Sequence, residues 1–263
     1  MRINIRRMTL ACLPGLLATT LHAQPQIGGG TCTSAALSGN YSLTMSGRDL
    51  SSAVAFSNVL QGVGSANFDG LSKVTFTLSN NTNKNFGVAQ TLLGTYSLQS
   101  NCIGAVTINT GDSATFTLGS YNQGAAFFID GQDGVYSLLG SGSALPSTCS
   151  ASLLSGVYSF NGNGFGLTSG AISGVNQVAG LLTFDGVGAV TSNWYVSVSG
   201  SNQNDTASGT FTINSNCTGT ATLTDSSKNV YSLQFTITNA KGNNFLVSGS
   251  NAQLMFVGSG RIL

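Results

Sequence analysis

Few side chains in this sequence could act as acids, bases or nucleophiles. The single histidine, His22, lies close to the N-terminus, and all eight acidic residues are aspartates. A serine or cysteine nucleophile of the usual kind needs a histidine as its base, and no Gly-x-Ser-x-Gly segment occurs. The residue types therefore indicate a protein that is not an enzyme and uses no cofactor.

The aspartates are typical of turns rather than of a carboxylate site. Phe-Asp-Gly occurs at Phe68–Gly70 and again at Phe184–Gly186, and Asp-Gly is the favoured central pair of a type I′ hairpin turn because both positions need a positive φ. In FFIDGQDG, the spacing of Asp130 and Asp133 suggests a calcium loop, but the further oxygen ligands of such a loop are missing. We interpret these segments as hairpin turns and expect no metal site.

Four cysteines follow the N-terminal segment, and we expect them to form disulfides. Cys32 and Cys149 each begin one half of the chain, and Cys102 and Cys217 follow them 70 and 68 residues later. In an up-and-down barrel the start of the first strand and the turn between strands four and five lie at the same end. The expected pairs are therefore Cys32–Cys102 and Cys149–Cys217. Zinc is disfavoured, because each half offers two cysteines and no histidine.

The first 23 residues are predicted to be a secretory signal peptide. Three arginines precede an apolar run from Met8 to Leu21, and a cleavage site follows Ala23. The run is too short for a transmembrane helix. We therefore expect a Sec-type signal that exports the protein to the periplasm, the cell surface or the medium, with a linker at 24–31.

Removal of this segment leaves a chain with little charge. Six basic residues then stand against eight aspartates, which gives a net charge near −2. No basic patch is available to hold a phosphate backbone, so nucleic acid is not an expected partner.

The rest of the chain is a duplicated domain. Leu-Ser-Gly-x-Tyr at Leu37–Tyr41 returns at Leu154–Tyr158, and the offset between matching segments stays within 115 to 118 residues over the whole length. Repeats of this length are whole domains. We expect one domain at 32–145 and a second at 146–263.

Each domain is predicted to be an all-β, eight-stranded, antiparallel up-and-down barrel. In the second domain Tyr231, Leu233, Phe235 and Ile237 alternate with polar residues, and turn signals separate eight such runs. Long strands with almost no charge would make hazardous exposed edges, and closure into a barrel removes them. Two β-sandwich domains are the alternative, because the cysteine spacing would suit an immunoglobulin-like fold.

The repeated segments resemble those of a large group of secreted bacterial proteins, found for example in acidobacteria, that carry a β-domain in tandem copies. The shared segments are Cys-x4-Leu-Ser-Gly-x-Tyr, Phe-Asp-Gly-x-Gly or similar, Gly-Thr-Tyr/Phe and Asn-Cys-x-Gly. The resemblance implies export and a tandem β-domain, and it transfers no functional site. Leu-Ser-Gly-Asn-Tyr also resembles, more distantly, the first strand of lipocalin- and avidin-like barrels, which have tryptophan in place of Tyr41 and Tyr158.

The leading hypothesis is a non-catalytic secreted protein that binds a small apolar molecule in a barrel cup. An eight-stranded barrel is wide enough to be filled by side chains or to hold one small ligand. The cup would open opposite the disulfide, where the long connections are expected at Arg48–Asn58, Ser79–Val88, Gly166–Gln177 and Ser199–Asp205. The candidate ligand-binding residues are Tyr158, Phe160, Phe184, Trp194 and Phe235, which on the alternative interpretation only pack the core.

Two other functions fit the sequence. A structural or adhesive component of the envelope or matrix would meet extracellular polymer, or other copies of itself, through its Ser, Thr and Asn faces. An outer-membrane barrel is disfavoured, because aromatic girdles and a terminal aromatic residue are missing. A membrane is therefore not an expected partner.

Overall fold

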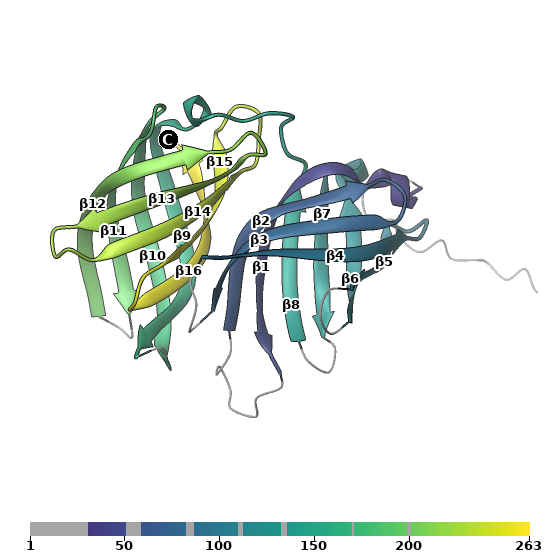
Figure 1. The fold of residues 1–263 in the computed structure, drawn as a ribbon, viewed down its shortest axis with the longest axis horizontal. Coiled ribbons are helices and arrows are strands. Elements are labelled where there is room, and N and C mark those ends of the chain that lie inside the picture. Colours follow the sequence, from purple (N-terminus) through teal and green to yellow (C-terminus); the bar gives the residue numbers. More distant parts are fainter. Residues whose placement is uncertain are drawn as a thin grey trace, which may run out of the picture.

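The chain forms two closed β-barrels, each made of eight antiparallel strands (Figure 1). The computed structural model describes residues 31–50, 59–82, 87–109, 113–132, 136–169, 171–198 and 201–263. Each strand pairs with the next one along the chain, and the last strand of each barrel pairs with the first. The predicted all-β fold of two tandem up-and-down barrels is confirmed, and the sandwich alternative is wrong.

The two barrels repeat the same order of elements. Barrel 1 consists of β1 (Ser38–Asp49), β2 (Val59–Asp69), β3 (Lys73–Thr82), β4 (Val88–Leu98), β5 (Ile103–Ile108), β6 (Ala114–Tyr121), β7 (Ala126–Gln132) and β8 (Tyr136–Ser143). Barrel 2 consists of β9 (Ser155–Thr168), β10 (Ala171–Asp185), β11 (Ala189–Val198), β12 (Ser201–Ile213), β13 (Thr218–Asp225), β14 (Val230–Ile237), β15 (Asn244–Ser250) and β16 (Leu254–Ile262). The described part of the chain also contains three short 3-10 turns, η1 (Ser34–Ala36), η2 (Asn122–Gly124) and η3 (Ala151–Leu153). Within the described ranges no helix is long and apolar enough to cross a membrane.

Alternate side chains point into each barrel, as the period of two predicts. In β10 Val178, Leu182 and Phe184 are buried, whereas Ala179 and Thr183 on the opposite face are exposed. Each barrel encloses its own apolar core.

Two of the long connections expected from the sequence are mostly strand. β9 continues to Thr168 and β10 begins at Ala171, so most of Gly166–Gln177 belongs to a hairpin, and β12 begins at Ser201. Glycine is typical of loops and therefore misleads here, yet at Gly164, just before this segment in β9, the neighbouring strand leaves no space for a side chain. A Cβ at Gly164 would clash with the backbone of β16. Of the other two connections, 51–58 and 83–86 lie outside the described residues.

The repeated Phe-Asp-Gly segment ends a strand, but its turn differs from the expected type I′ turn. Gly70 and Gly186 both have a φ of +77°, whereas neither aspartate has a positive φ. Instead, Oδ1 of Asp185 accepts the backbone N–H groups two, three and four residues ahead, at 2.8, 2.8 and 2.9 Å. Asp69 makes the same three bonds at 2.7, 2.8 and 2.9 Å. The carboxylate therefore caps the turn, and this role explains why the segment returns.

The repeated Leu-Ser-Gly-x-Tyr segment closes one end of each barrel. The Tyr158 hydroxyl donates to the carbonyl oxygen of Gly242 at 2.9 Å, and Tyr41 donates to that of Gly124 at 2.7 Å. Each bond ties the first strand to the connection between the sixth and seventh strands. The two tyrosines thus fasten equivalent ends of the two barrels.

The disulfides lie at the same ends and join Cys32 to Cys102 and Cys149 to Cys217, the pairing expected from the sequence, with Cα atoms 4.9 Å apart in both. Disulfides of this kind are typical of an oxidising, extracytoplasmic setting. The predicted signal peptide and almost all of the linker at 24–31 lie outside the described residues.

The Asp185 cap leads to a prediction about stability. Hydrogen bonds from the backbone N–H groups of Gly188, Val187 and Ala189 hold the pKa of Asp185 below its ordinary value. A carboxyl whose folded pKa is depressed stabilises the fold above its unfolded pKa of about 3.9, and this contribution is lost as the pH falls through the folded pKa. We expect Asp185→Ala to lower the thermal midpoint at pH 7, and Asp185→Asn to lower it less because an acceptor oxygen remains.

Thermal unfolding followed by circular dichroism between pH 2 and pH 7 measures this effect, and the gap between wild type and Asp185→Ala should narrow with acidification. Asp130→Asn is the control, because this exposed aspartate caps no turn in the described part of the chain. A gap that stays constant with pH would contradict a role for the charge.

Candidate functional site

The five predicted ligand-binding residues lie in the core of barrel 2. Each is at most 4% exposed, and each contacts another aromatic ring of the cluster. Phe184 lies at the centre, with ring centroids 5.5 Å from Tyr158 and 5.6 Å from Phe235 in edge-to-face geometry. Trp194 packs on Phe160 at 5.7 Å. The side chains thus fill the barrel around them, and their role in binding stays a prediction.

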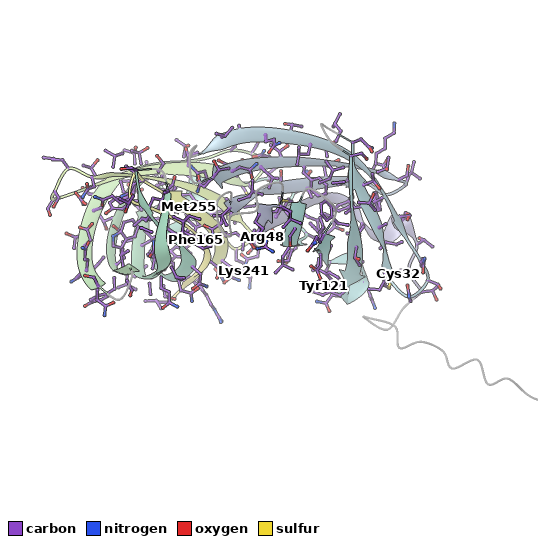
Figure 2. The ribbon with its side chains drawn as sticks, turned by 90° about the horizontal axis from the view of Figure 1, so that it is seen from below. Cys32, Arg48, Tyr121, Phe165, Lys241 and Met255 are labelled. Atoms are coloured by element: carbon purple, nitrogen blue, oxygen red, sulfur yellow. A yellow bond between two sulfur atoms is a disulfide. The ribbon has the colours of Figure 1, made fainter. Side chains whose placement is uncertain are left out.

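The outer faces of the two barrels also pack against each other. An apolar cluster between the barrels contains Val59 from β2 together with Leu167 and Met255 from barrel 2, all buried. Phe165 packs against this cluster, beside Met255 in the paired strands β9 and β16 (Figure 2). Outward residues of both barrels are therefore buried where the barrels meet.

Neutral hydrogen bonds continue this contact. The Asn81 side-chain amide donates to the Ser248 hydroxyl at 2.6 Å, and the Thr236 hydroxyl donates to the backbone oxygen of Gly64 at 3.0 Å. The Gln61 amide reaches the backbone oxygen of Asn163 at 3.2 Å. Buried amides and hydroxyls are costly unless they are paired, so these bonds favour one arrangement of the barrels.

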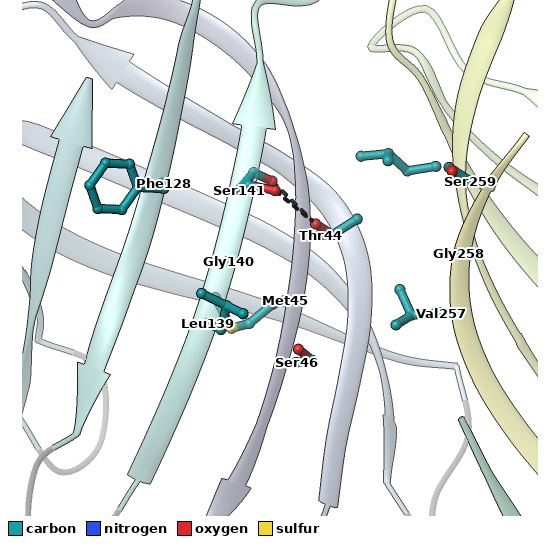
Figure 3. Close-up of a pocket in the computed structure, with 11 residues that line it drawn as sticks. Thr44, Met45, Ser46, Phe128, Leu139, Gly140, Ser141, Val257, Gly258 and Ser259 are labelled. Atoms are coloured by element: carbon teal, nitrogen blue, oxygen red, sulfur yellow. Dashed lines mark hydrogen bonds between the residues drawn. The ribbon is translucent and has the colours of Figure 1, made fainter. Parts of the chain in front are cut away.

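A groove runs beside this contact, and we call it the interbarrel groove. Its central hollow, about 390 Å³ in volume, lies between β1 and β8 of barrel 1 and β15 and β16 of barrel 2 (Figure 3). Apolar side chains from both barrels form its walls, and hydroxyl groups lie among them, with Thr44 and Ser141 3.4 Å apart. The lining residues are Thr44, Met45, Ser46, Phe128, Leu139, Gly140, Ser141, Leu246, Val257, Gly258 and Ser259.

Two further hollows share walls with the central one. A hollow of about 250 Å³ shares Ser46 and Leu139 with it and is also lined by Arg48 and Asp130. The other, about 420 Å³, shares Leu246 and Ser259 and extends over the outer face of barrel 2 to Arg261. The groove is therefore elongated, with an arginine in each outer hollow.

The structure separates the predicted site residues from this groove, apart from one. Phe160 borders the hollow near Arg261, whereas Tyr158, Phe184, Trp194 and Phe235 line none of the three hollows. Reasoning from the sequence missed the groove, because its walls come from strands more than 100 residues apart. The only available signal was the row of apolar residues at outward positions, such as Leu139 and Val257, which alternation along a strand can identify.

The groove residues are poor metal ligands. Among the described residues no group of three or more His, Cys, Asp or Glu side chains is placed to hold a metal ion. Asp130 is exposed in the small hollow with Arg48, and Asp133, its partner in the calcium-loop motif, lies outside the described residues. The chemistry that the groove offers is burial of apolar surface with hydroxyl groups for orientation.

No protein-family model matches this chain, and a comparison with curated proteins finds no match either.

The position of Tyr158 predicts a structural effect of its substitution. Tyr158→Phe removes the hydroxyl that pairs with Gly242 and keeps the ring in place, so we expect the free energy of unfolding to fall by about 1 kcal/mol. Urea unfolding measures this value. Tyr195→Phe is the control, because Tyr195 is 61% exposed. An equal effect of both substitutions would contradict the closing role of Tyr158.

Proposed function

We propose that this protein is a non-catalytic, exported binding protein that takes a small, elongated apolar molecule in the interbarrel groove. The observation that carries the proposal is the hollow of about 390 Å³ with apolar walls from both barrels. Binding sites for small molecules commonly have volumes of about 300–1,000 Å³, apolar walls with a few polar groups, and a position between domains.

The shape of the groove supports an elongated ligand. Its hollows follow one another from Arg48 to Arg261, with Leu139, Leu246 and Val257 in the middle. A molecule that lies across this middle part covers Leu139, which is 59% exposed. Removing such apolar surface from water favours binding by about 25 cal/mol per Å².

The groove replaces the barrel cup as the place for the ligand. The part of barrel 2 around Phe184 is filled by rings in mutual contact, and opening a cup there would break several aromatic contacts of about 0.5–1.5 kcal/mol each. The groove needs no such rearrangement. Binding on the outer faces is also consistent with the closure of each barrel at one end.

Export fits the side-chain distribution as well as the disulfides. Apolar side chains fill the barrels, while Ser, Thr and Asn residues cover much of the outside. A transmembrane barrel has the reverse arrangement, with an apolar outer band. The resemblance to secreted tandem β-domain proteins supports the same setting.

A structural or adhesive role is the second candidate, and the turn tips favour it. Leu71 and Val187 follow the two Asp-Gly pairs at equivalent positions and are 77% and 84% exposed. An apolar side chain repeated at the tips of two capped turns could contact extracellular polymer or another copy of the chain.

A fluorescent apolar probe tests the proposed function. We expect N-phenyl-1-naphthylamine to bind the full mature chain saturably, and Leu139→Asn to weaken binding about fivefold through lost apolar contact. Leu93→Asn is the matched control, because Leu93 lies on β4 with a similar exposure of 57%.

The outcomes of this titration differ clearly. Equal effects of the two substitutions would place the probe outside the groove, and absence of saturable binding would leave the adhesive role as the better proposal. Deletion of the apolar tips by Leu71→Ser and Val187→Ser should not affect probe binding.

A further inference from the structure

A group of polar side chains lies inside barrel 2, toward the end opposite its disulfide. The Tyr231 hydroxyl lies 3.0 Å from Oδ2 of Asp205 and 3.3 Å from Oδ2 of Asp225. Asp225 also accepts the backbone N–H and the side-chain amide of Asn229, at 2.8 and 2.7 Å. The Tyr231 hydroxyl has one proton and can donate it to only one of the two carboxylates at a time. The other carboxylate then receives no hydrogen bond from Tyr231.

Neither carboxyl group has a cationic partner among the described residues. In the described part of the chain no lysine or arginine forms an ion pair with Asp205 or Asp225, and Lys228 in the adjoining turn is no exception. Burial acts to raise the pKa of Asp225, but hydrogen bonds from Asn229, from the Asp205 side chain and from the Ser227 backbone outweigh it and leave the pKa below its ordinary value. Asp225 is therefore negatively charged at neutral pH, and it is only 5% exposed.

Two further buried side chains have polar atoms without a hydrogen-bond partner among the described residues. Trp194 stands opposite Asp205 in the paired strands β11 and β12, and its ring centroid lies 5.0 Å from that of Tyr231. Trp194 is 1% exposed, and its indole N–H has no acceptor. Asn176, on the inward face of β10, is fully buried, and both polar atoms of its amide lack a partner. Buried polar groups are nearly always paired, so these side chains are candidates for pairing with a bound molecule.

Barrel 1 serves as an internal comparison, because it forms the same closed barrel without these residues. The strand registers place matching positions 115 to 117 residues apart. The barrel 1 residues that match Asn176, Trp194, Asp205 and Tyr231 are Leu60, Leu78, Gln90 and Ala114. The fold therefore does not require the polar and aromatic set of barrel 2.

We propose that barrel 2 binds a small organic cation, an alkylammonium or quaternary ammonium group, between Asp205, Asp225 and the rings of Trp194 and Tyr231. Carboxylates without a cation attract a positive charge, and aromatic faces stabilise an ammonium group through cation–π contact. A hard metal ion fits less well, because the aromatic rings offer it no oxygen ligands. Asp205 is partly exposed and gives the cation a route from solvent.

Trp194 is the only tryptophan of the chain, so its fluorescence reports on this site alone. We expect choline to change the emission of the full mature protein saturably, while 3,3-dimethylbutan-1-ol, its neutral analogue of the same shape, leaves the emission unchanged. Sodium chloride at the same concentration controls for ionic strength.

The variants introduce the barrel 1 residues of the matching positions, Gln90 and Leu78. Asp205→Gln should weaken choline binding about tenfold, and Trp194→Leu, followed by calorimetry, should weaken it by a similar factor. Asp130→Asn removes a carboxylate elsewhere and should leave binding unchanged. Leu139→Asn in the groove should also leave it unchanged, which separates this proposal from the proposed binding of apolar molecules.

Several outcomes would overturn the cation site. These are an emission that does not respond to choline, an equal response to the neutral analogue, unchanged affinity in Asp205→Gln and Trp194→Leu, or a response to calcium chloride without one to choline. Circular dichroism of both variants establishes that the barrel is folded before the titration is interpreted.

Discussion

Closure of each sheet on itself is the constraint on which the rest of the structure depends. β1 pairs with β8 and β9 with β16, so strands with almost no charge have no free edge in either barrel. Closure with eight strands also fixes an interior just wide enough for side chains. The aromatic cluster around Phe184 occupies this interior in barrel 2, which accounts for both the high aromatic burial and the lack of a cup at these residues.

The scarcity of charge has a second consequence outside the barrels. Outer faces that carry hydroxyl and amide groups can be buried against each other without the desolvation of ions, and the bonds of Asn81 and Thr236 use this property. Two convex barrels touch only along a strip, so hollows remain beside the contact wherever their walls diverge. The interbarrel groove follows from this geometry and needs no dedicated loop.

The sequence predicts the strands, the closure and the disulfide pairs well, because alternation, absence of charge and duplication each carry a physical signal. It predicts the turn chemistry less well. Asp185 looks like the first central residue of a type I′ turn, whereas it ends the strand and caps the turn with its side chain. The site is predicted worst, since inward alternation marks Trp194 and Phe184 as facing the interior without telling a filled interior from an empty one. The groove depends on how two barrels pack, and outward apolar residues such as Leu139 mark its walls without showing that packing.

Duplication provides a way to separate the residues that the fold needs from those that it does not. Asp69 and Asp185 cap equivalent turns, and Tyr41 and Tyr158 close equivalent ends, so recurrence of these residues is explained by folding alone.

The carboxylate of Asp205 recurs in neither sequence nor geometry: at the matching place in barrel 1, Gln90 accepts a hydrogen bond from Asn80 at 2.5 Å. Barrel 1 therefore has a neutral pair of amides at this place, and barrel 2 has a carboxyl group. A carboxyl group that is partly withdrawn from water is less favourable than a neutral pair of amides unless other groups compensate for the lost hydration. The two barrels thus differ at this end in side chains whose presence the shared fold does not explain.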